Sequence, residues 1–94
     1  MYKTRELEAF DAYMRLGGVK LAAEHMDTSQ PMISRLLSGL EDKTGFALFL
    51  RKRNRLTPTP EAFRFHQSVM RHLAGLRDLE QEAVAIATGQ VGHL

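Results

Sequence analysis

The sequence predicts a mainly α fold, in which three short helices and a two-stranded hairpin precede one long final helix. Three observations lead to this prediction. Apolar residues recur at helical spacing in three segments before Gly45. A cluster of cations then lies between short stretches of apolar and β-branched residues, which is typical of a hairpin. From Glu61 to Ala87, only Gly75 interrupts a helical pattern.

Composition and charge limit the class of protein. The sequence is 44% hydrophobic and 26% charged, as expected of one small globular domain. No apolar run approaches the roughly 18 residues of a membrane span, and the first residues lack the apolar segment of a signal peptide. With no cysteine, there is neither a disulfide framework nor a thiolate zinc site. We therefore expect a cytoplasmic domain without cofactor, metal or membrane contact.

The first two predicted helices, residues 5–16 and 19–26, form the scaffold. Thr4 can cap the first, and Gly17 ends it because glycine readily adopts a left-handed C-cap. Asp27 marks the turn after the second helix, since Asp tolerates a left-handed backbone. Their apolar residues are Leu7, Ala9, Phe10, Tyr13, Met14 and Leu16, followed by Leu21, Ala22 and Met26.

The third predicted helix, residues 30–43, stands in helix-turn-helix register with the second. Asp27 lies four residues after the small Ala23, Ile33 ten and Leu36 thirteen. The small residue lets the two helices approach closely, and the aliphatic residues then lock the second helix against the first. With the hairpin and the long helix, this pattern predicts a winged helix-turn-helix followed by a linker helix.

The start of the third helix presents side chains that suit the reading of DNA bases. Its apolar stripe leaves Gln30, Met32, Ser34 and Arg35 on the outside. Gln can pair bidentately with adenine, Arg with guanine, and Ser can contact either base edge. A helix N-terminus also attracts phosphate. The alternative is an ordinary capped surface helix.

A cationic tip marks the predicted hairpin. Phe46, Leu48 and Leu50 alternate before the tip, and Leu56 resumes the apolar pattern after it. The tip carries no acid, and its cations are Arg51, Lys52, Arg53 and Arg55. Arginines on a wing can enter a minor groove or bind phosphates. The alternative is a basic turn that only faces solvent.

The long helix carries a coiled-coil pattern. Pro60 can take its first position after a Thr59 cap. Two apolar series then repeat every seven residues and define an a/d seam. The seam and its flanking Leu73 predict a dimer interface of Ala62, Phe65, Val69, His72, Leu73, Leu76, Leu79, Ala83 and Ile86. The alternative is a helix that folds back onto its own domain.

Several stretches together resemble one protein family. They are Leu7-Glu8-Ala9-Phe10, Ala22-Ala23-Glu24, Ser29-Gln30-Pro31-Met32-Ile33-Ser34-Arg35, Leu40-Glu41, Gly45-Phe46-Ala47-Leu48-Phe49 and Leu56-Thr57. This combination is similar to the N-terminal winged helix-turn-helix of LysR-type transcriptional regulators. The join Pro58-Thr59-Pro60-Glu61 resembles a subset that includes opine-catabolism regulators.

The resemblance implies a bacterial regulator that binds an interrupted dyad of double-stranded DNA as a homodimer, with a tetramer possible in the full-length protein. It adds Pro31 to the base-facing positions and places Thr28 and Ser29 at the DNA backbone. Residues 1–58 would be the DNA-binding domain, 59–88 the dimerisation linker, and 89–94 a hinge toward a C-terminal domain absent from this sequence. A small-molecule effector would bind only that absent domain.

Two other classes of function remain open. A winged-helix module for protein interaction would share the seam but would not need the outward polar residues of the third helix. An enzyme would need a catalytic cluster, and the only neutral-pH bases of note are His25, His66, His72 and His93. No nucleophile or ligand motif accompanies them, so we expect no catalysis.

Overall fold

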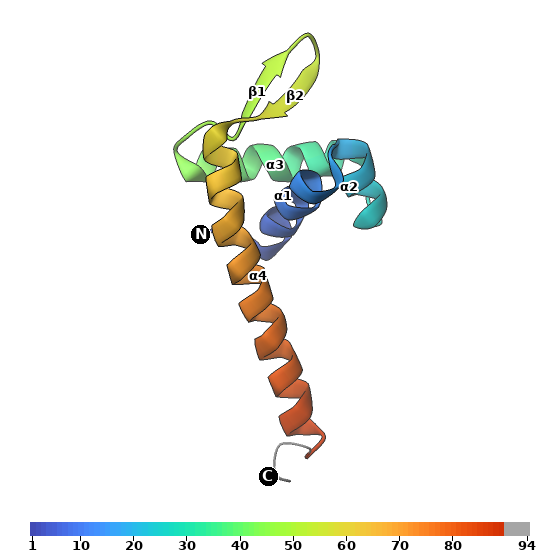
Figure 1. Cartoon of the computed structure of the whole chain (residues 1–94). Coiled ribbons are helices and arrows are strands. Elements are labelled where there is room, and N and C mark those ends of the chain that lie inside the picture. Colours follow the sequence, from blue (N-terminus) through green and yellow to red (C-terminus); the bar gives the residue numbers. More distant parts are fainter. Residues whose placement is uncertain (90–94) are drawn as a thin grey trace.

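The computed structural model describes residues 1–89 as a helical head with one hairpin and a projecting helix (Figure 1). Its elements are α1 (Thr4–Leu16), α2 (Val19–His25), α3 (Gln30–Thr44), β1 (Phe49–Lys52), β2 (Arg55–Pro58) and α4 (Pro60–Ala87). We call α1, α2, α3 and the hairpin the head, and we call the hairpin alone the wing. The predicted fold class is confirmed. The expected hinge extends through residues 90–94, which lie outside the described residues.

The core of the head forms where α1 packs against α2, α3 and α4. Apolar stripes on the helices and the entry to the wing supply it, as the helical spacing predicted. Its largest fully buried side chains are Phe10, Ile33, Leu37, Leu40 and Leu48. Each such side chain contributes about 1.5–3 kcal/mol when it leaves water. The core therefore fixes α3 from beneath and leaves its opposite face free.

The second helix differs from its predicted packing. Leu21 was expected among its apolar contacts, but it is 48% exposed. Ala22 and Ala23, which were both expected at this contact, are buried and make the contact face of this short helix. Small side chains permit the close approach of α2 to its neighbours, and that packing leaves Leu21 on the opposite side.

The helix ends follow the local signals in the sequence. Gly17 ends α1 and Gly45 ends α3, both with a left-handed backbone at φ 91° and 79°. Asp27 also has a positive φ, 54°, in the turn before α3. One start differs: Lys3 is the N-cap of α1, and the expected cap Thr4 is its first helical residue.

An ion pair between the buried Glu6 and the exposed Lys43 joins the start of α1 to the end of α3. The Glu6 carboxylate accepts hydrogen bonds from Lys43 Nζ at 2.8 and 3.0 Å and from the Lys3 backbone N–H at 3.0 Å. Burial raises the pKa of Glu6, but the Lys43 hydrogen bond, the Lys3 N–H and both positive charges outweigh burial and hold it below its usual value. Gly39 makes room for this pair, because a Cβ there would lie 2.7 Å from Glu6 Oε2.

The wing is an antiparallel pair whose register runs from Phe49 opposite Pro58 to Lys52 opposite Arg55. The alternation of Phe46, Leu48 and Leu50 predicted an earlier strand, and this prediction is wrong. Leu48 and Phe49 are both buried, whereas Phe46 and Leu50 are exposed. Leu48 belongs to the connection that enters the core, and the strand begins only after it.

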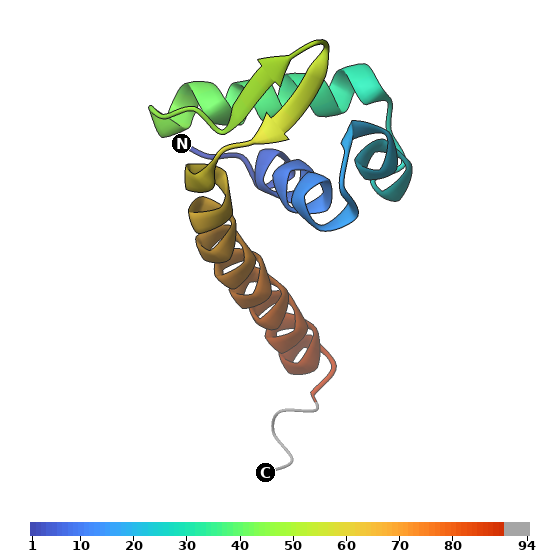
Figure 2. The same cartoon turned by 45° about the horizontal axis from the view of Figure 1, so that its top comes forward.

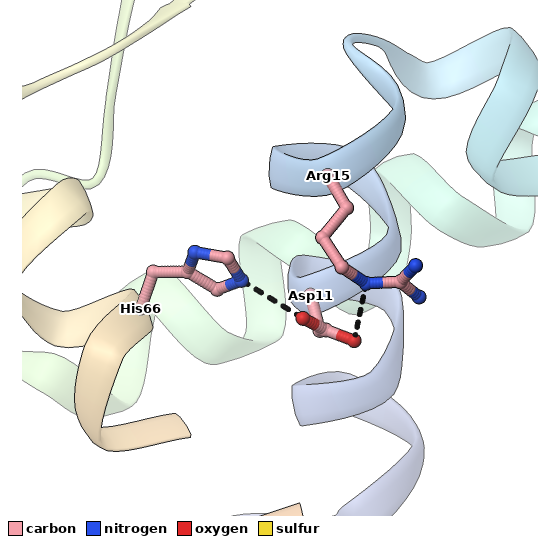
Figure 3. Close-up of polar contacts among 3 residues, drawn as sticks. All are labelled: Asp11, Arg15 and His66. Carbon is pink, nitrogen blue, oxygen red and sulfur yellow. Dashed lines mark hydrogen bonds and ion pairs between the residues drawn. The ribbon is translucent and has the colours of Figure 1, made fainter. Parts of the chain in front are cut away.

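The first half of α4 packs against the head. Ala62, His66, Val69 and Leu73 are buried, and His66 Nε2 lies 2.8 Å from Asp11 Oδ1 on α1. Figure 3 shows Asp11 between His66 and Arg15, whose Nε donates to the other carboxylate oxygen at 3.0 Å. These contacts fix the direction in which α4 leaves the head.

The expected dimer interface therefore needs a correction. Ala62, Val69 and Leu73 are buried inside their own chain, so the prediction that they face a partner is wrong. The alternative of a helix folded back onto its own domain holds for this half of α4. The expected boundary near residue 59 stays a prediction, since the helix that follows it shares the core of the head.

No helix among residues 1–89 is long and apolar enough to cross a membrane.

Candidate nucleic-acid interface

The start of α3 is held by its own cap. Ser29 Oγ accepts a hydrogen bond from the Met32 backbone N–H at 3.2 Å, which satisfies one free donor of the first turn. Pro31 occupies this turn, where its missing N–H costs nothing. The next backbone N–H, of Ile33, donates to the Ser29 carbonyl at 3.1 Å, so the helical hydrogen bonds begin at once. A helix start of this kind presents positive dipole charge to an anion.

The side chains around this start face away from the core. Gln30, Pro31, Ser34 and Arg35 are exposed, and Thr28 and Met32 are half-buried. Ile33 between them is fully buried. The helical repeat thus turns the aliphatic residues inward and the hydrogen-bonding groups outward.

The wing places its cations in solvent. Arg51, Lys52, Arg53 and Arg55 are all exposed. Within residues 1–89, the cations in ion pairs are Arg15, Lys43 and, when protonated, His66, so the wing cations have no acidic partner in this part of the chain. Their charge is available to an external anion.

A two-residue turn carries the tip of the wing. Arg53 and Asn54 both have a left-handed backbone, with φ of 51° and 62°. Turns with positive φ at both central residues match the twist of a hairpin. This geometry places Arg53 in the turn at the tip of the wing, between β1 and β2.

The helix start and the wing border one groove. Figure 2 shows the hairpin crossing over α3, and the open space between them is about 1090 Å³. The groove is lined by Val19, Gln30, Pro31, Ser34, Arg51, Arg53, Asn54, Arg55 and Leu56. None of these residues is acidic, so the groove combines a helix N-terminus, hydrogen-bonding side chains and free arginines. Such a surface suits a polyanion with readable edges.

The groove includes only part of the predicted set. Thr28, Ser29, Met32, Arg35 and Lys52 do not line it, although Arg35 and Lys52 are exposed nearby in sequence. Sequence reasoning missed three lining residues: Val19, Asn54 and Leu56. Asn54 could have been included because it lies between predicted contacts, whereas Val19 carries no chemical signal of its own.

The base of the wing is tied to both neighbouring helices. Glu41 Oε2 on α3 accepts hydrogen bonds from the backbone N–H groups of Leu48 at 2.8 Å and Phe49 at 3.0 Å. Thr59 Oγ1 donates to the Ala47 carbonyl at 2.8 Å and accepts from the Ala62 N–H at 3.1 Å. One carboxylate thus joins the wing to α3, and one hydroxyl joins the wing to α4.

The histidines of residues 1–89, which are His25, His66 and His72, do not gather into a metal site, and His93 lies outside the described residues. His66 is engaged with Asp11, and its ring meets Phe10 edge-on at 5.7 Å between centroids. Within the described part of the chain, no group of three or more His, Cys, Asp or Glu side chains could hold a metal ion. His66 therefore serves packing between α1 and α4.

The second half of α4 keeps an apolar face without a partner in its own head. Leu79 is 65% exposed and Ile86 is 61% exposed. They continue the part of the seam that points away from the head, which consists of His72, Leu76, Leu79, Ala83 and Ile86. We call these residues the free seam. Phe65 of the expected interface packs against the core of the head instead, beside Phe10 and Phe46.

Comparison with known proteins identifies relatives of the whole chain. The family described as bacterial regulatory helix-turn-helix proteins of the lysR family matches residues 4–63. Regulatory protein NocR of Agrobacterium fabrum strain C58 is 40% identical over 94 residues, which cover 100% of this chain and 31% of the relative. The octopine catabolism/uptake operon regulatory protein OccR of Rhizobium meliloti is 39% identical, over 96% of this chain and 30% of the relative.

A solved structure agrees in fold with the complete head and α4. The DNA-binding domain of BenM, in a structure described as a complex with catB site 1 DNA, superposes with a TM-score of 0.86 at 27% identity. The match covers 98% of this chain and 99% of that one. The chain spans just under a third of the length of the curated relatives it matches.

Proposed function

The chain belongs to the lysR family of bacterial regulatory helix-turn-helix proteins, and on this basis we propose that it binds double-stranded DNA in a sequence-dependent way. The start of α3 enters a major groove, where Gln30, Ser34 and Arg35 contact base edges. The curated relatives are regulatory proteins, and family membership confirms the expectation that this chain is not an enzyme.

The observation that supports DNA binding most strongly is the shared groove. Polar side chains of α3 and unpaired arginines of the wing line the same space, and no acid interrupts them. Bidentate base contacts from Gln and Arg supply discrimination, while wing cations displace counterions from phosphates. In this proposal, Thr28, Ser29 and Lys52 contact the DNA backbone from outside the groove, and Pro31 and Met32 contact bases from the first turn.

We propose that a homodimer forms through the free seam. An isolated helix would expose the large apolar side chains of Leu79 and Ile86, and pairing with a second copy would remove them from water. A symmetric dimer carries two α3 helices, so its DNA site has two related half-sites with an interruption between them. His72 is the polar member of the free seam.

The relatives are more than three times as long as this chain, as the covered share of NocR shows. We propose that the chain acts as the N-terminal module of a cytoplasmic regulator of similar length. An effector would then bind a different part of that protein. Assembly of the complete regulator into a tetramer belongs to the same proposal.

Selection of bound duplexes from a random pool tests sequence-dependent binding. We expect the retained duplexes to share an interrupted dyad. A second selection with Arg35→Ala should lose information at one base pair of each half-site, because a bidentate base contact is worth about 1–3 kcal/mol. A pool that stays random, or binding that does not weaken with salt, would refute the proposal and favour a protein-interaction module.

A further inference from the structure

One hydrogen bond holds the wing to the helices at a point beyond the base of the hairpin. The hydroxyl of Tyr13 on α1 donates a hydrogen bond to the carbonyl oxygen of Leu56 on β2, over 2.9 Å. Glu41 and Thr59 hold only residues 47–49 at the base of the wing. Within the described chain, no other hydrogen bond from outside the hairpin reaches residues 50–57. The Tyr13 hydroxyl is therefore the polar contact nearest to the cationic tip.

Tyr13 is itself rigidly placed. It is 5% exposed, and its ring meets Phe49 of β1 nearly edge-on, with centroids 5.1 Å apart and planes at 77°. Burial raises the pKa of Tyr13, so the hydroxyl keeps its proton and remains a donor at neutral pH. The ring contacts one strand and the hydroxyl binds the other, which fixes the wing against α1.

The anchored carbonyl lies beside the proposed DNA contacts. Leu56 pairs with Arg51 across the hairpin, directly follows Arg55 and lines the groove. The turn residue Arg53 precedes Leu56 by three residues, at most about 10 Å at the rise of a strand. A small rotation of the hairpin about the Leu56 carbonyl therefore displaces the Arg53 side chain, relative to α3, farther than it displaces Leu56 itself.

We propose that Tyr13 is a positioning residue for DNA binding, and that its hydroxyl sets the angle between the wing and α3. It touches no DNA itself. Its hydrogen bond determines where Arg51, Arg53 and Arg55 meet the phosphate backbone when α3 occupies the major groove. This inference rests on the proposed DNA binding.

Tyr13→Phe tests the inference, because it removes the hydroxyl and keeps the ring against Phe49. Binding to a selected duplex should be measured over a range of salt concentrations. We expect about three- to tenfold weaker binding at low salt and a salt slope reduced by about one phosphate contact. Tyr2→Phe is the matched control: Tyr2 is 43% exposed and its hydroxyl makes no hydrogen bond within the described chain, so binding should not change.

A double-variant comparison separates positioning from general loosening of the fold. Tyr13→Phe is repeated in a background where Arg51, Arg53 and Arg55 are all replaced by Gln. If the hydroxyl acts through the wing cations, it should cause no further loss there. An equal loss in both backgrounds, or unchanged binding in the native background, would overturn the inference.

Different results would refute the proposed DNA binding and the positioning role of Tyr13. If the native chain shows no salt-dependent duplex binding, the proposed function falls, and this inference falls with it. If the native chain binds and Tyr13→Phe binds equally well, only the positioning role is refuted. Amide hydrogen exchange on the free protein adds a readout that needs no DNA, since the variant should exchange faster between Arg51 and Leu56.

Discussion

Replacing Glu6 with Gln tests the ion pair that holds α1 to α3. The carboxylate accepts two contacts from Lys43 Nζ and one from the Lys3 N–H, and its side chain is only 6% exposed. Hydrogen bonds to charged groups contribute about 1.5–3 kcal/mol. Gln retains an amide oxygen that can accept one of these bonds. We therefore expect the free energy of unfolding to fall by about 1–2 kcal/mol at pH 7.

The pH dependence of this loss has a defined sign. The pKa of Glu6 is lower in the folded protein than its ordinary value of 4.5, so the folded state favours the charged form. Its stabilisation is complete above about pH 4.5 and is lost as pH falls through the folded pKa. The difference between native and Glu6→Gln proteins should therefore be largest at neutral pH and shrink toward zero in acid.

Urea denaturation at pH 7 and at about pH 3 measures both effects. Glu8→Gln is the matched control, since Glu8 lies on the same helix, is exposed and makes no ion pair within residues 1–89. It should change stability little at either pH. A Glu6→Gln protein as stable as the native one at pH 7, or a deficit of the same size in acid, would refute the reasoning.

Three further predictions concern the wing, the free seam and the contact between α1 and α4. Arg53→Gln should weaken binding to all duplexes and flatten the salt slope by about one unit, as measured by fluorescence anisotropy; a loss confined to one sequence would contradict backbone contact. Leu79→Glu should shift the sedimentation coefficient from dimer to monomer without lowering the melting temperature of the head, and an unchanged mass would argue against the free seam. Asp11→Ala should lower the free energy of unfolding by about 1–3 kcal/mol, because it leaves His66 without its partner; an unchanged melting curve would show that the contact is dispensable.

Local signals allowed much of the head to be predicted. Ser29, Gly45 and Thr59 are residue types with strong preferences at helix ends, and each ends or begins a helix where expected. The buried stripe with Ile33 and Leu40 follows from a repeat within one helix. These features depend on residues a few positions apart, which sequence patterns describe well.

The packing of α4 depends on distant contacts. The heptad count found two series that are apolar except at His72, but it could not show that a neighbouring stripe with Ala62, His66 and Leu73 turns toward α1. The two stripes share Ala62 and Val69, so their spacing alone does not separate them. Only the position of α1, and of Asp11 upon it, decides which stripe the head covers.

In the candidate interface, too, local patterns were predicted from the sequence and contacts between distant segments were not. The pattern of α3 predicted that Gln30 and Ser34 face outward, and they do. The contribution of Val19 and the contact from Tyr13 to Leu56 could not be predicted, because each joins segments that meet only in the folded chain. The strand start was misplaced because two adjacent residues, Leu48 and Phe49, are both buried at the entry to the wing.

The most direct test of the account is an NMR titration of the chain with a duplex obtained by selection. The central claim is that the start of α3 reads bases while the wing binds the adjacent backbone. It predicts that the largest amide shifts fall on residues 30–35 and 51–55, with the core of the head and the free seam little changed. Shifts concentrated on α4 or on the exposed Phe46, with residues 30–35 unaffected, would contradict it.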